Sequence, residues 1–237
     1  KVATVLETNL PVMMETQPGV LAYHYHQAGF AEKAISYYLK SGAMLFSWGA
    51  MEESIQHLNN GLELVRTLPP TRQRDELELE TLSKMISPVY SLYSFQGTSL
   101  LIICDDIIGL SERLQDFEEA CGALLMLVYS YLTLGEESEA RKILSKMKEF
   151  SSKGKALDPV IKFHSITAVI SFLYEDTSMA EEHWKKGIRI YENLNYSNKS
   201  KYLDGGILCL SELRLGRTIR GITDEELCRI NKSIELA

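Results

Sequence analysis

The chain has 237 residues, 45% of them hydrophobic and 24% charged, so it is long enough to form a folded core and its composition argues against disorder. Its formal net charge of −7 argues against broad contact with nucleic acid or an anionic membrane, because such binding needs clustered cations. The longest apolar runs, near Leu101 and Met126, are far shorter than the roughly 20 residues that span a membrane. We therefore expect protein, peptide or small-ligand partners.

The cysteines are widely spaced and form no CxxC pair, which indicates free thiols in a reducing compartment such as the cytoplasm. They are Cys104, Cys121, Cys209 and Cys228. The chain begins at Lys1 without a charged and then apolar leader, so we expect a fragment of a longer protein. We expect one helical-repeat domain over residues 1–237 and leave residues 1–15 open as the tail of a preceding domain.

Helical periodicity dominates the sequence, whereas the alternation typical of strands is almost absent. Helix formers and apolar residues at spacings of three and four predict about eleven helices joined by short links. In chain order they cover residues 18–28, 31–48, 51–67, 75–95, 99–115, 117–134, 137–150, 158–174, 178–194, 204–219 and 224–236. The predicted fold class is therefore all-α.

Three segments share one spacing of small, aromatic, glycine and alanine residues. The first two are Leu21, Ala22, Tyr25, Gly29, Ala34 and Tyr38, and Leu127, Val128, Tyr131, Gly135, Ala140 and Leu144. The third keeps the spacing but lacks the turn glycine: Thr167, Ala168, Ser171, Glu175, Ala180 and Trp184. This order is typical of a tetratricopeptide unit, which must stack on copies of itself to bury its apolar face. We predict a tetratricopeptide-like α-α superhelix, a solenoid of antiparallel helix pairs; an irregular helical bundle is the alternative.

The stretch LAYHYHQAG places His24 and His26 one residue apart, which raises the question of a metal site. Pro18 and Gly29 bracket this stretch as a helix. Side chains two apart on a helix point about 200° apart, so the two rings cannot grip one ion. We predict that both histidines are packing or surface residues and that there is no metal site.

No other pattern predicts catalysis. The remaining histidines lie on separate predicted helices: His57, His164 and His183. There is no HExxH, GxSxG or phosphate-binding loop. The paired acids Asp105 and Asp106 read as an exposed helix edge, and the acidic run from Asp75 to Glu80 reads as a solvated helix start. We therefore expect no catalytic residue, no cofactor and no enzyme activity.

Residues 17–69 resemble the tetratricopeptide segment that follows the ATPase module of AAA/STAND-type signalling proteins, notably multidomain class III adenylate cyclases. The matching residues there are Gln27, Ala28, Gly29, Ala31, Glu32, Ala34, Ile35, Leu39, Lys40, Gly42, His57, Leu58, Gly61, Leu62, Glu63 and Leu64. Later matches are His164, Ala180, His183, Gly187, Tyr191, Asp204, Gly206, Cys209, Leu210, Ser211 and Leu213. The match fades over residues 85–110, where Pro88 falls inside a predicted helix.

The resemblance implies a non-catalytic interaction and sensing module that binds a protein or peptide, in particular neighbouring domains of the same polypeptide, and regulates an attached ATPase or cyclase. The catalytic residues of those domains would lie outside this chain. A second hypothesis is that the chain is the effector-binding solenoid of a MalT-like transcription regulator. A third reading is an enzyme that acts within the solenoid, and it rests only on scattered His and Asp residues.

The sequence departs from this family in residues 214–221, where an apolar line is replaced by RLGRTIRG. Arg214, Arg217 and Arg220 would form one cationic stripe on a helix, because residues three apart share a face. Such a stripe cannot be buried unpaired without a large desolvation penalty. It is either a solvated face of a terminal repeat or a docking stripe for an acidic partner surface.

Overall fold

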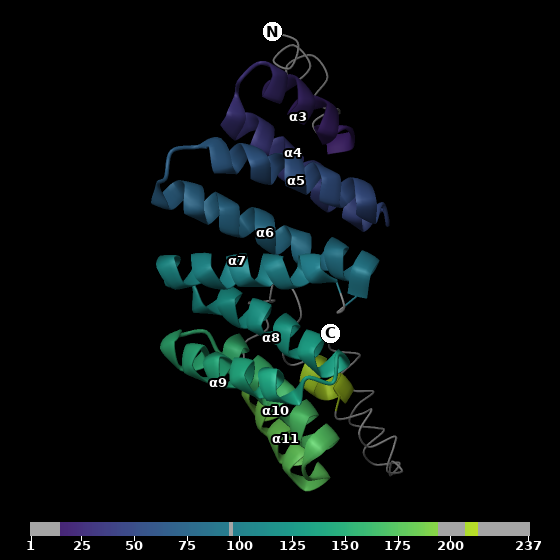
Figure 1. Ribbon diagram of the computed structural model, residues 1–237, viewed down its shortest axis with the longest axis vertical. Coiled ribbons are helices and arrows are strands. Elements are labelled where there is room, and N and C mark those ends of the chain that lie inside the picture. Colours follow the sequence, from purple (N-terminus) through teal and green to yellow (C-terminus); the bar gives the residue numbers. More distant parts are fainter. Residues whose placement is uncertain (1–14, 95–96, 194–206, 213–237) are drawn as a thin grey trace. The chain divides into compact units, whose positions relative to one another are not determined.

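A computed structural model describes residues 15–94, 97–193 and 207–212 of the chain (Figure 1). The helices in these ranges are α3 Pro18–Gln27, α4 Ala31–Ser47, α5 Met51–Thr67, α6 Arg72–Tyr93, α7 Thr98–Leu114, α8 Phe117–Thr133, α9 Glu137–Lys153, α10 Asp158–Tyr174 and α11 Thr177–Glu192. Residues 207–212 form a further helical segment. The predicted helices are confirmed over these ranges. Of the helix expected over 204–219 only residues 207–212 are described, and the helix expected over 224–236 lies outside the described residues.

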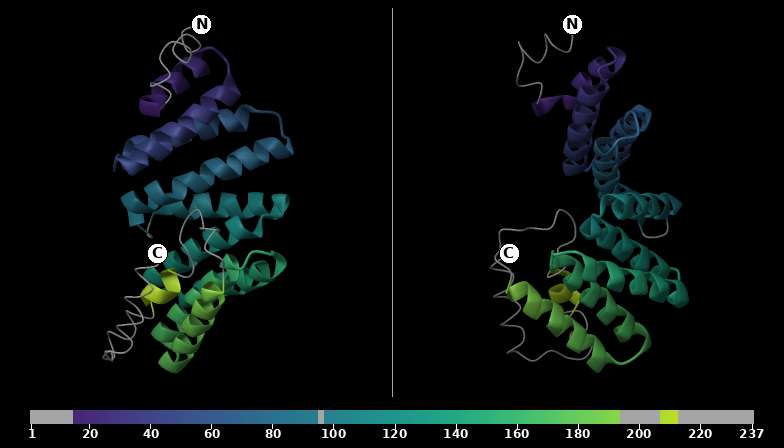
Figure 2. Two further views of the ribbon diagram at one scale, coloured as in Figure 1. Left: turned by 180° about the vertical axis from the view of Figure 1, so that it is seen from behind. Right: turned by 90° about the vertical axis from the view of Figure 1, so that its left-hand side faces the viewer.

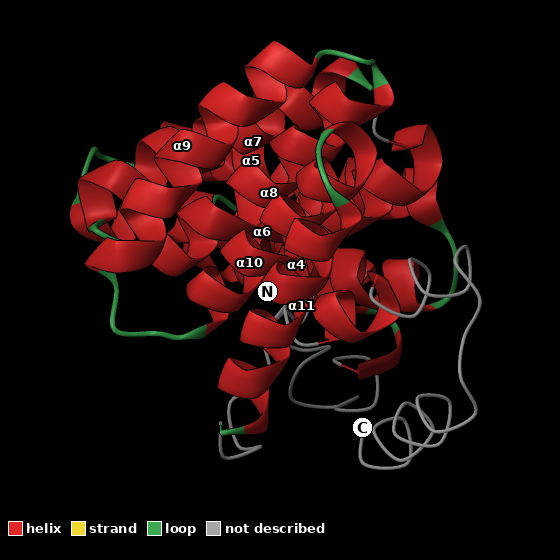
Figure 3. Ribbon diagram, turned by 90° about the horizontal axis from the view of Figure 1, so that it is seen from below, coloured by secondary structure: helices red, strands yellow, loops and turns green. Residues whose placement is uncertain are grey.

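The chain divides into two compact units, residues 1–115 and residues 116–237. In the first unit, each helix from α3 to α7 packs on the next, and α4 also contacts α6 (Figure 2). In the second unit, α8 packs on α9 and α10 on α11, while α10 contacts both helices of the preceding pair. The described residues contain helices, turns and loops but no strand (Figure 3). The fold is therefore all-α and of the helical-repeat type.

Three of the turns between packed helices use glycine in the left-handed conformation, which side chains with a Cβ rarely adopt. Gly29, Gly49 and Gly135 have φ values of 76°, 81° and 76°. In each turn the amide of the residue after the glycine donates to a carbonyl five residues back. The three bonds are Phe30 N to Tyr25 O at 3.0 Å, Ala50 N to Leu45 O at 2.9 Å and Glu136 N to Tyr131 O at 2.9 Å. The same device therefore closes three helix pairs.

The turn at Gly49 identifies a copy of the repeat that the sequence comparison missed. Ser54 stands where the other copies have Ala34 and Ala140, and its side chain is likewise fully buried. The Ser54 hydroxyl donates to the carbonyl oxygen of Gly42 at 2.7 Å, so its polarity is satisfied inside the helix pair. A repeat pattern that requires alanine at this position therefore misses Ser54, which is also small and whose hydroxyl finds an acceptor in Gly42.

The third predicted copy of the repeat closes without glycine. Glu175 ends α10 with φ −126° and ψ −107°, so this turn differs from the other three. The buried positions of the copy are nonetheless kept, because Ala168 and Ala180 are fully buried and Trp184 is 4% exposed. The small residues allow α10 and α11 to approach closely, as the spacing predicts.

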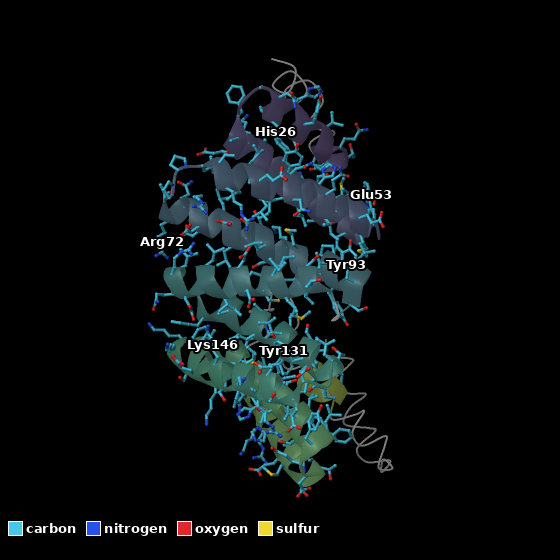
Figure 4. The ribbon with its side chains drawn as sticks, in the orientation of Figure 1. His26, Glu53, Arg72, Tyr93, Tyr131 and Lys146 are labelled. Carbon is cyan, nitrogen blue, oxygen red and sulfur yellow. The ribbon has the colours of Figure 1, made fainter. Side chains whose placement is uncertain are left out.

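Helix α6 runs through Pro88, where the family resemblance fades. It begins at Arg72 rather than near residue 75, because the Thr71 hydroxyl caps the amide of Arg74 at 3.2 Å. Figure 4 shows Arg72 and Tyr93 at its opposite ends. The proline removes one backbone donor, but the helix continues to Tyr93.

The expected single domain over residues 1–237 stays a prediction, as does the tail expected over residues 1–15, of which only Glu15 is described. No helix in the described ranges combines the length and the apolar character that crossing a membrane requires.

Candidate functional site

His24 and His26, which lie one residue apart on α3, contact different neighbours. The His24 ring meets the Tyr23 ring edge-on at 5.6 Å. Nδ1 of His26, a residue labelled in Figure 4, lies 3.2 Å from the Tyr38 hydroxyl. Within residues 15–94, 97–193 and 207–212, no three His, Cys, Asp or Glu side chains are grouped to hold a metal ion. The stretch contributes ring packing between α3 and α4.

The acidic run at the start of α6 does not form the fully solvated helix start that we predicted. Glu78 is only 6% exposed. Its carboxylate accepts from Arg66 at 2.7 Å and from Arg74 at 2.5 Å, so helices α5 and α6 are clamped through it. Burial acts to raise the pKa of Glu78, but the two guanidinium donors outweigh burial and lower that pKa below its usual value. Periodicity alone missed this residue because its partner Arg66 comes from another helix.

The paired acids of α7 lie at an exposed helix edge, as predicted. Asp105 is exposed, and the side chain of Asp106 is 43% exposed. Asp106 accepts from Arg66 at 2.9 Å, which extends the Glu78 clamp to α7. An exposed carboxylate already paired with arginine is a poor catalytic base, and the arrangement reads as a surface ion pair across three helices.

The three described cysteines are free, as predicted, and all three are buried: Cys104, Cys121 and Cys209. Burial raises the pKa of Cys104 and of Cys121 to about 12. The thiolate is the reactive form of cysteine, so these two thiols are inert at neutral pH. They fill the core as small apolar groups.

His164 and His183, which the sequence places on separate helices, meet across the α10–α11 pair. Their Nδ1 atoms lie 3.0 Å apart, so one ring donates an N–H and the other accepts it. Burial, helped by the charge of His183, lowers the pKa of His164 to about 4, and burial also lowers that of His183. The positions of the two histidines within the repeat could have predicted this contact. His164 lies four residues before Ala168 and His183 three after Ala180, so both are on the faces that the buried alanines share.

A second polar cluster lies in the same unit around the carboxylate of Glu212. The helical segment 207–212, yellow in Figure 2, carries this side chain, whose hydrogen-bond partners lie on α8, α10 and α11. Oε1 accepts from the hydroxyl of Tyr129 on α8. Oε2 accepts from the hydroxyl of Ser165 on α10 at 2.6 Å and from Nε1 of Trp184 on α11 at 2.9 Å. Three neutral donors from three helices therefore converge on one carboxylate.

Burial raises the pKa of both acidic groups in this cluster. Burial raises the pKa of Tyr129, so the phenol keeps the proton that it donates. Burial also raises the pKa of Glu212, although the hydrogen bonds from Ser165, Tyr129 and Trp184 act in the opposite direction. Ser165 is fully buried and Trp184 is 4% exposed, so these two donors are held in place by the surrounding core.

Cys209 anchors the same segment three residues before Glu212. It is fully buried with Ile161, Ala168, Ala180 and Trp184. Its thiol lies 3.8 Å from the carbonyl oxygen of Ile161. A Cβ atom at Gly187 would lie 2.5 Å from the Cys209 sulfur, so only glycine leaves room for it. Gly187 and Cys209 both belong to the family resemblance, but the repeat spacing does not predict the contact between them.

The predicted docking stripe of Arg214, Arg217 and Arg220 lies outside the described residues. It stays a prediction from the sequence, whereas the polar cluster around Glu212 is the best-formed candidate site in the described part of the chain.

No known family model matches the chain, and no curated protein shows significant sequence similarity to it. The fold and contacts therefore define an all-α helical-repeat protein, in whose second unit the helical segment 207–212 packs on α8, α10 and α11 through the partly buried carboxylate of Glu212.

Proposed function

We propose that the chain is a non-catalytic protein-interaction and regulatory module of a multidomain signalling protein of the ATPase–cyclase type, working in the cytoplasm. Its partners would be proteins or peptides, in particular neighbouring domains of the same polypeptide. The resemblance of residues 17–69 to the repeat region of such proteins supports the class. Stacked helix pairs suit this role because they present extended binding surfaces.

The observation that carries the proposal is the packing of residues 207–212 against α8, α10 and α11 within the second unit. Donors on α8, α10 and α11 converge on Glu212, and Gly187 leaves space for Cys209. The second unit thus already holds one helical segment through defined polar and steric contacts. A surface of this kind can also serve recognition of a partner helix.

The state of the reactive side chains also supports a non-catalytic role. The carboxylate of Glu78 is held by two arginines, and the imidazoles of His164 and His183 face each other. The thiols of Cys104 and Cys121 are buried with raised pKa values. Each of these groups is engaged in packing or pairing and none is poised as a nucleophile. Free buried thiols also fit a reducing compartment.

The formal net charge of −7 favours a partner other than nucleic acid or an anionic membrane. Against this acidic background, Arg214, Arg217 and Arg220 would supply a local cationic stripe for an acidic partner surface. Electrostatic complementarity of this kind speeds association and selects partners.

The test is a binding measurement between this chain and the neighbouring domains of its polypeptide, each produced separately and titrated by calorimetry. We expect saturable binding that weakens with added salt and in the triple variant R214E/R217E/R220E, whose helical circular dichroism should match that of the native chain. Absence of binding to every neighbouring domain would overturn the proposal. So would turnover in a panel of nucleotide and hydrolase assays that one point change in this chain abolishes.

A further inference from the structure

We propose that Tyr129, Ser165 and Trp184 form a carboxylate-recognition site for an acidic helical segment of a partner protein, and that residues 207–212 are its internal occupant. The inference rests on the proposed function and specifies the ligand that the second unit recognises. A partner segment would carry a glutamate three residues after a small side chain, as Glu212 follows Cys209.

The donors are arranged for a carboxylate. Glu212 presents two oxygens that accept three hydrogen bonds, one at Oε1 and two at Oε2. A side chain that served only packing here would be apolar, because even partial removal of a carboxylate from water carries a desolvation penalty that an apolar residue avoids. The Trp184 N–H can only donate, so the atom that faces it must be an acceptor. The site therefore favours an acidic side chain over a hydrophobic one.

The donor atoms are held in position by the core of the second unit. Trp184 packs with Ile161, Ala168 and Ala180, and its ring lies 5.9 Å from that of Phe172. Ser165 is fully buried on α10. Donors fixed in this way lose little freedom when a ligand binds, which favours recognition.

A second contact defines which residue can precede the glutamate. A Cβ atom on Gly187 would lie 2.5 Å from the Cys209 sulfur, so this close contact requires glycine at 187 and favours a small side chain at 209. Residues three apart lie on one face of a helix, so the small residue and the glutamate reach the second unit together. The recognised pattern is therefore a small residue, two others and a glutamate in helical conformation.

The internal occupant controls access to this site. Residues 207–212 follow α11 in the same chain, so their local concentration at the site is of the order of millimolar for a short connection. A free segment of similar intrinsic affinity would compete poorly with them. The site becomes available when the internal segment is released, which makes residues 207–212 an intramolecular competitor of the partner.

The experiment uses the full chain and the peptide DGGILSLSEL, residues 204–213 with Cys209→Ser, labelled with fluorescein. In the chain variant C209R/E212A, arginine cannot fit against Gly187 and the internal carboxylate is gone, so the site should be vacated. We expect this variant to bind the peptide at least ten-fold more tightly than the native chain, by fluorescence anisotropy. Adding Y129F and S165A to it removes two donors with little change of shape, and should weaken binding at least ten-fold.

The matched ligand control replaces the peptide glutamate with alanine, and this peptide should bind the vacated chain at least ten-fold more weakly. No binding of the acidic peptide to a C209R/E212A chain with native helical content overturns the proposal. Binding that does not depend on the peptide glutamate overturns it equally. Neither result touches the binding of neighbouring domains, so failure of this inference is distinguishable from failure of the proposed function.

A measurement on the native chain decides the question if C209R/E212A is less helical. Cys209 is fully buried by the second unit, so displacement of residues 207–212 should expose its thiol. With unlabelled peptide at about 1 mM, on the order of the local concentration of the tethered segment, we expect at least ten-fold faster alkylation of Cys209 by mass spectrometry. The alanine peptide should leave the rate unchanged. An unchanged rate with the acidic peptide overturns the proposal.

Discussion

The Nδ1 atoms of His164 and His183 lie 3.0 Å apart, so each imidazole is the hydrogen-bond partner of the other. A hydrogen bond between them needs a proton on one Nδ1 and a lone pair on the other, so at least one of the two rings must be neutral. Two imidazolium rings would place two N–H groups and two positive charges face to face. The α10–α11 pair is therefore coupled to the protonation of these two side chains.

We expect the second unit to lose stability as the pH falls from about 7 to 5. The pKa of His164 is lowered to about 4 by burial and by His183, so the unfolded chain binds protons that the folded chain does not. Around His183, Lys186 lowers its pKa further, whereas Glu182 and Glu175 raise it. Because both rings are partly exposed, we expect a loss of only about 1 kcal/mol, measured by urea unfolding at each pH.

The variant His183→Leu isolates this effect, because it removes the facing ring. Its stability should depend less on pH over the same range than that of the native chain. The pKa of Glu212 is raised, so its protonation adds stability as the pH falls. This contribution is the same in both chains and cancels when their pH dependences are compared. The control His24→Asn, on α3 of the first unit, should keep the native pH dependence. An identical pH dependence in H183L and the native chain would contradict the assignment.

The repeat register could be predicted from the sequence because its physical causes are local. The left-handed turn needs glycine, which stands at Gly29 and Gly135, and close helix pairing needs a small residue, which stands at Ala34 and Ala140. Such requirements recur at fixed spacing and can be recognised without a structure. The Gly49 turn shows the limit, because Ser54 satisfies the packing requirement with a different residue type.

The polar cluster around Glu212 could not be predicted in the same way. Tyr129 and Glu212 are 83 positions apart, and no periodic pattern links them. A glutamate in an apolar helix normally marks the solvent-exposed face, and only the three-dimensional arrangement supplies the donors that allow Glu212 to be partly buried. Glu78 was misread for the same reason, since its partner Arg66 lies on a neighbouring helix.

Because Gly135 lies in a left-handed turn and Gly122 in a helix interior, alanine substitutions at the two positions should change the free energy of unfolding in opposite directions. Gly135→Ala should destabilise the chain by about 1 kcal/mol, because alanine resists a positive φ even though its Cβ would have open space. Gly122→Ala, inside α8 and also with open space for a Cβ, should stabilise by about 0.5–1 kcal/mol because glycine weakens a helix interior. Urea unfolding measures both. Two changes of the same sign would argue against this turn.

The close approach of α8 and α9 predicts that bulk is not tolerated at Ala140. Ala140 is fully buried, so Ala140→Phe should cost about 1–3 kcal/mol through overpacking. The adjacent Glu139 forms a surface ion pair with Lys142 at 2.5 Å, so Glu139→Ala should cost less than about 1 kcal/mol. Thermal melting followed by circular dichroism compares the two variants. Equal melting temperatures would show that the assigned register is wrong.

Substitutions at Glu212 measure how much its hydrogen bonds contribute to the free energy of unfolding, apart from the packing of the rest of residues 207–212. Glu212→Ala leaves the donors of Tyr129, Ser165 and Trp184 without their acceptor, and we expect a loss of about 1–3 kcal/mol for the unfolding of the second unit. Glu212→Gln keeps one carbonyl oxygen for the Trp184 N–H and should lose less.

Ser211→Ala is the matched control for Glu212, because Ser211 is exposed and its hydroxyl donates to the Leu208 carbonyl within the same segment. Urea unfolding followed by Trp184 fluorescence reports on the site directly, with the signal of Trp48 removed by Trp48→Phe in every variant. Trp48 is 66% exposed, so that background substitution should cost little. Since an engaged donor that loses its acceptor inside a protein carries the full desolvation penalty, the alanine variant must be the least stable of the three. If Glu212→Ala were as stable as Ser211→Ala, the convergence of donors on Glu212 would contribute nothing to holding residues 207–212 in place.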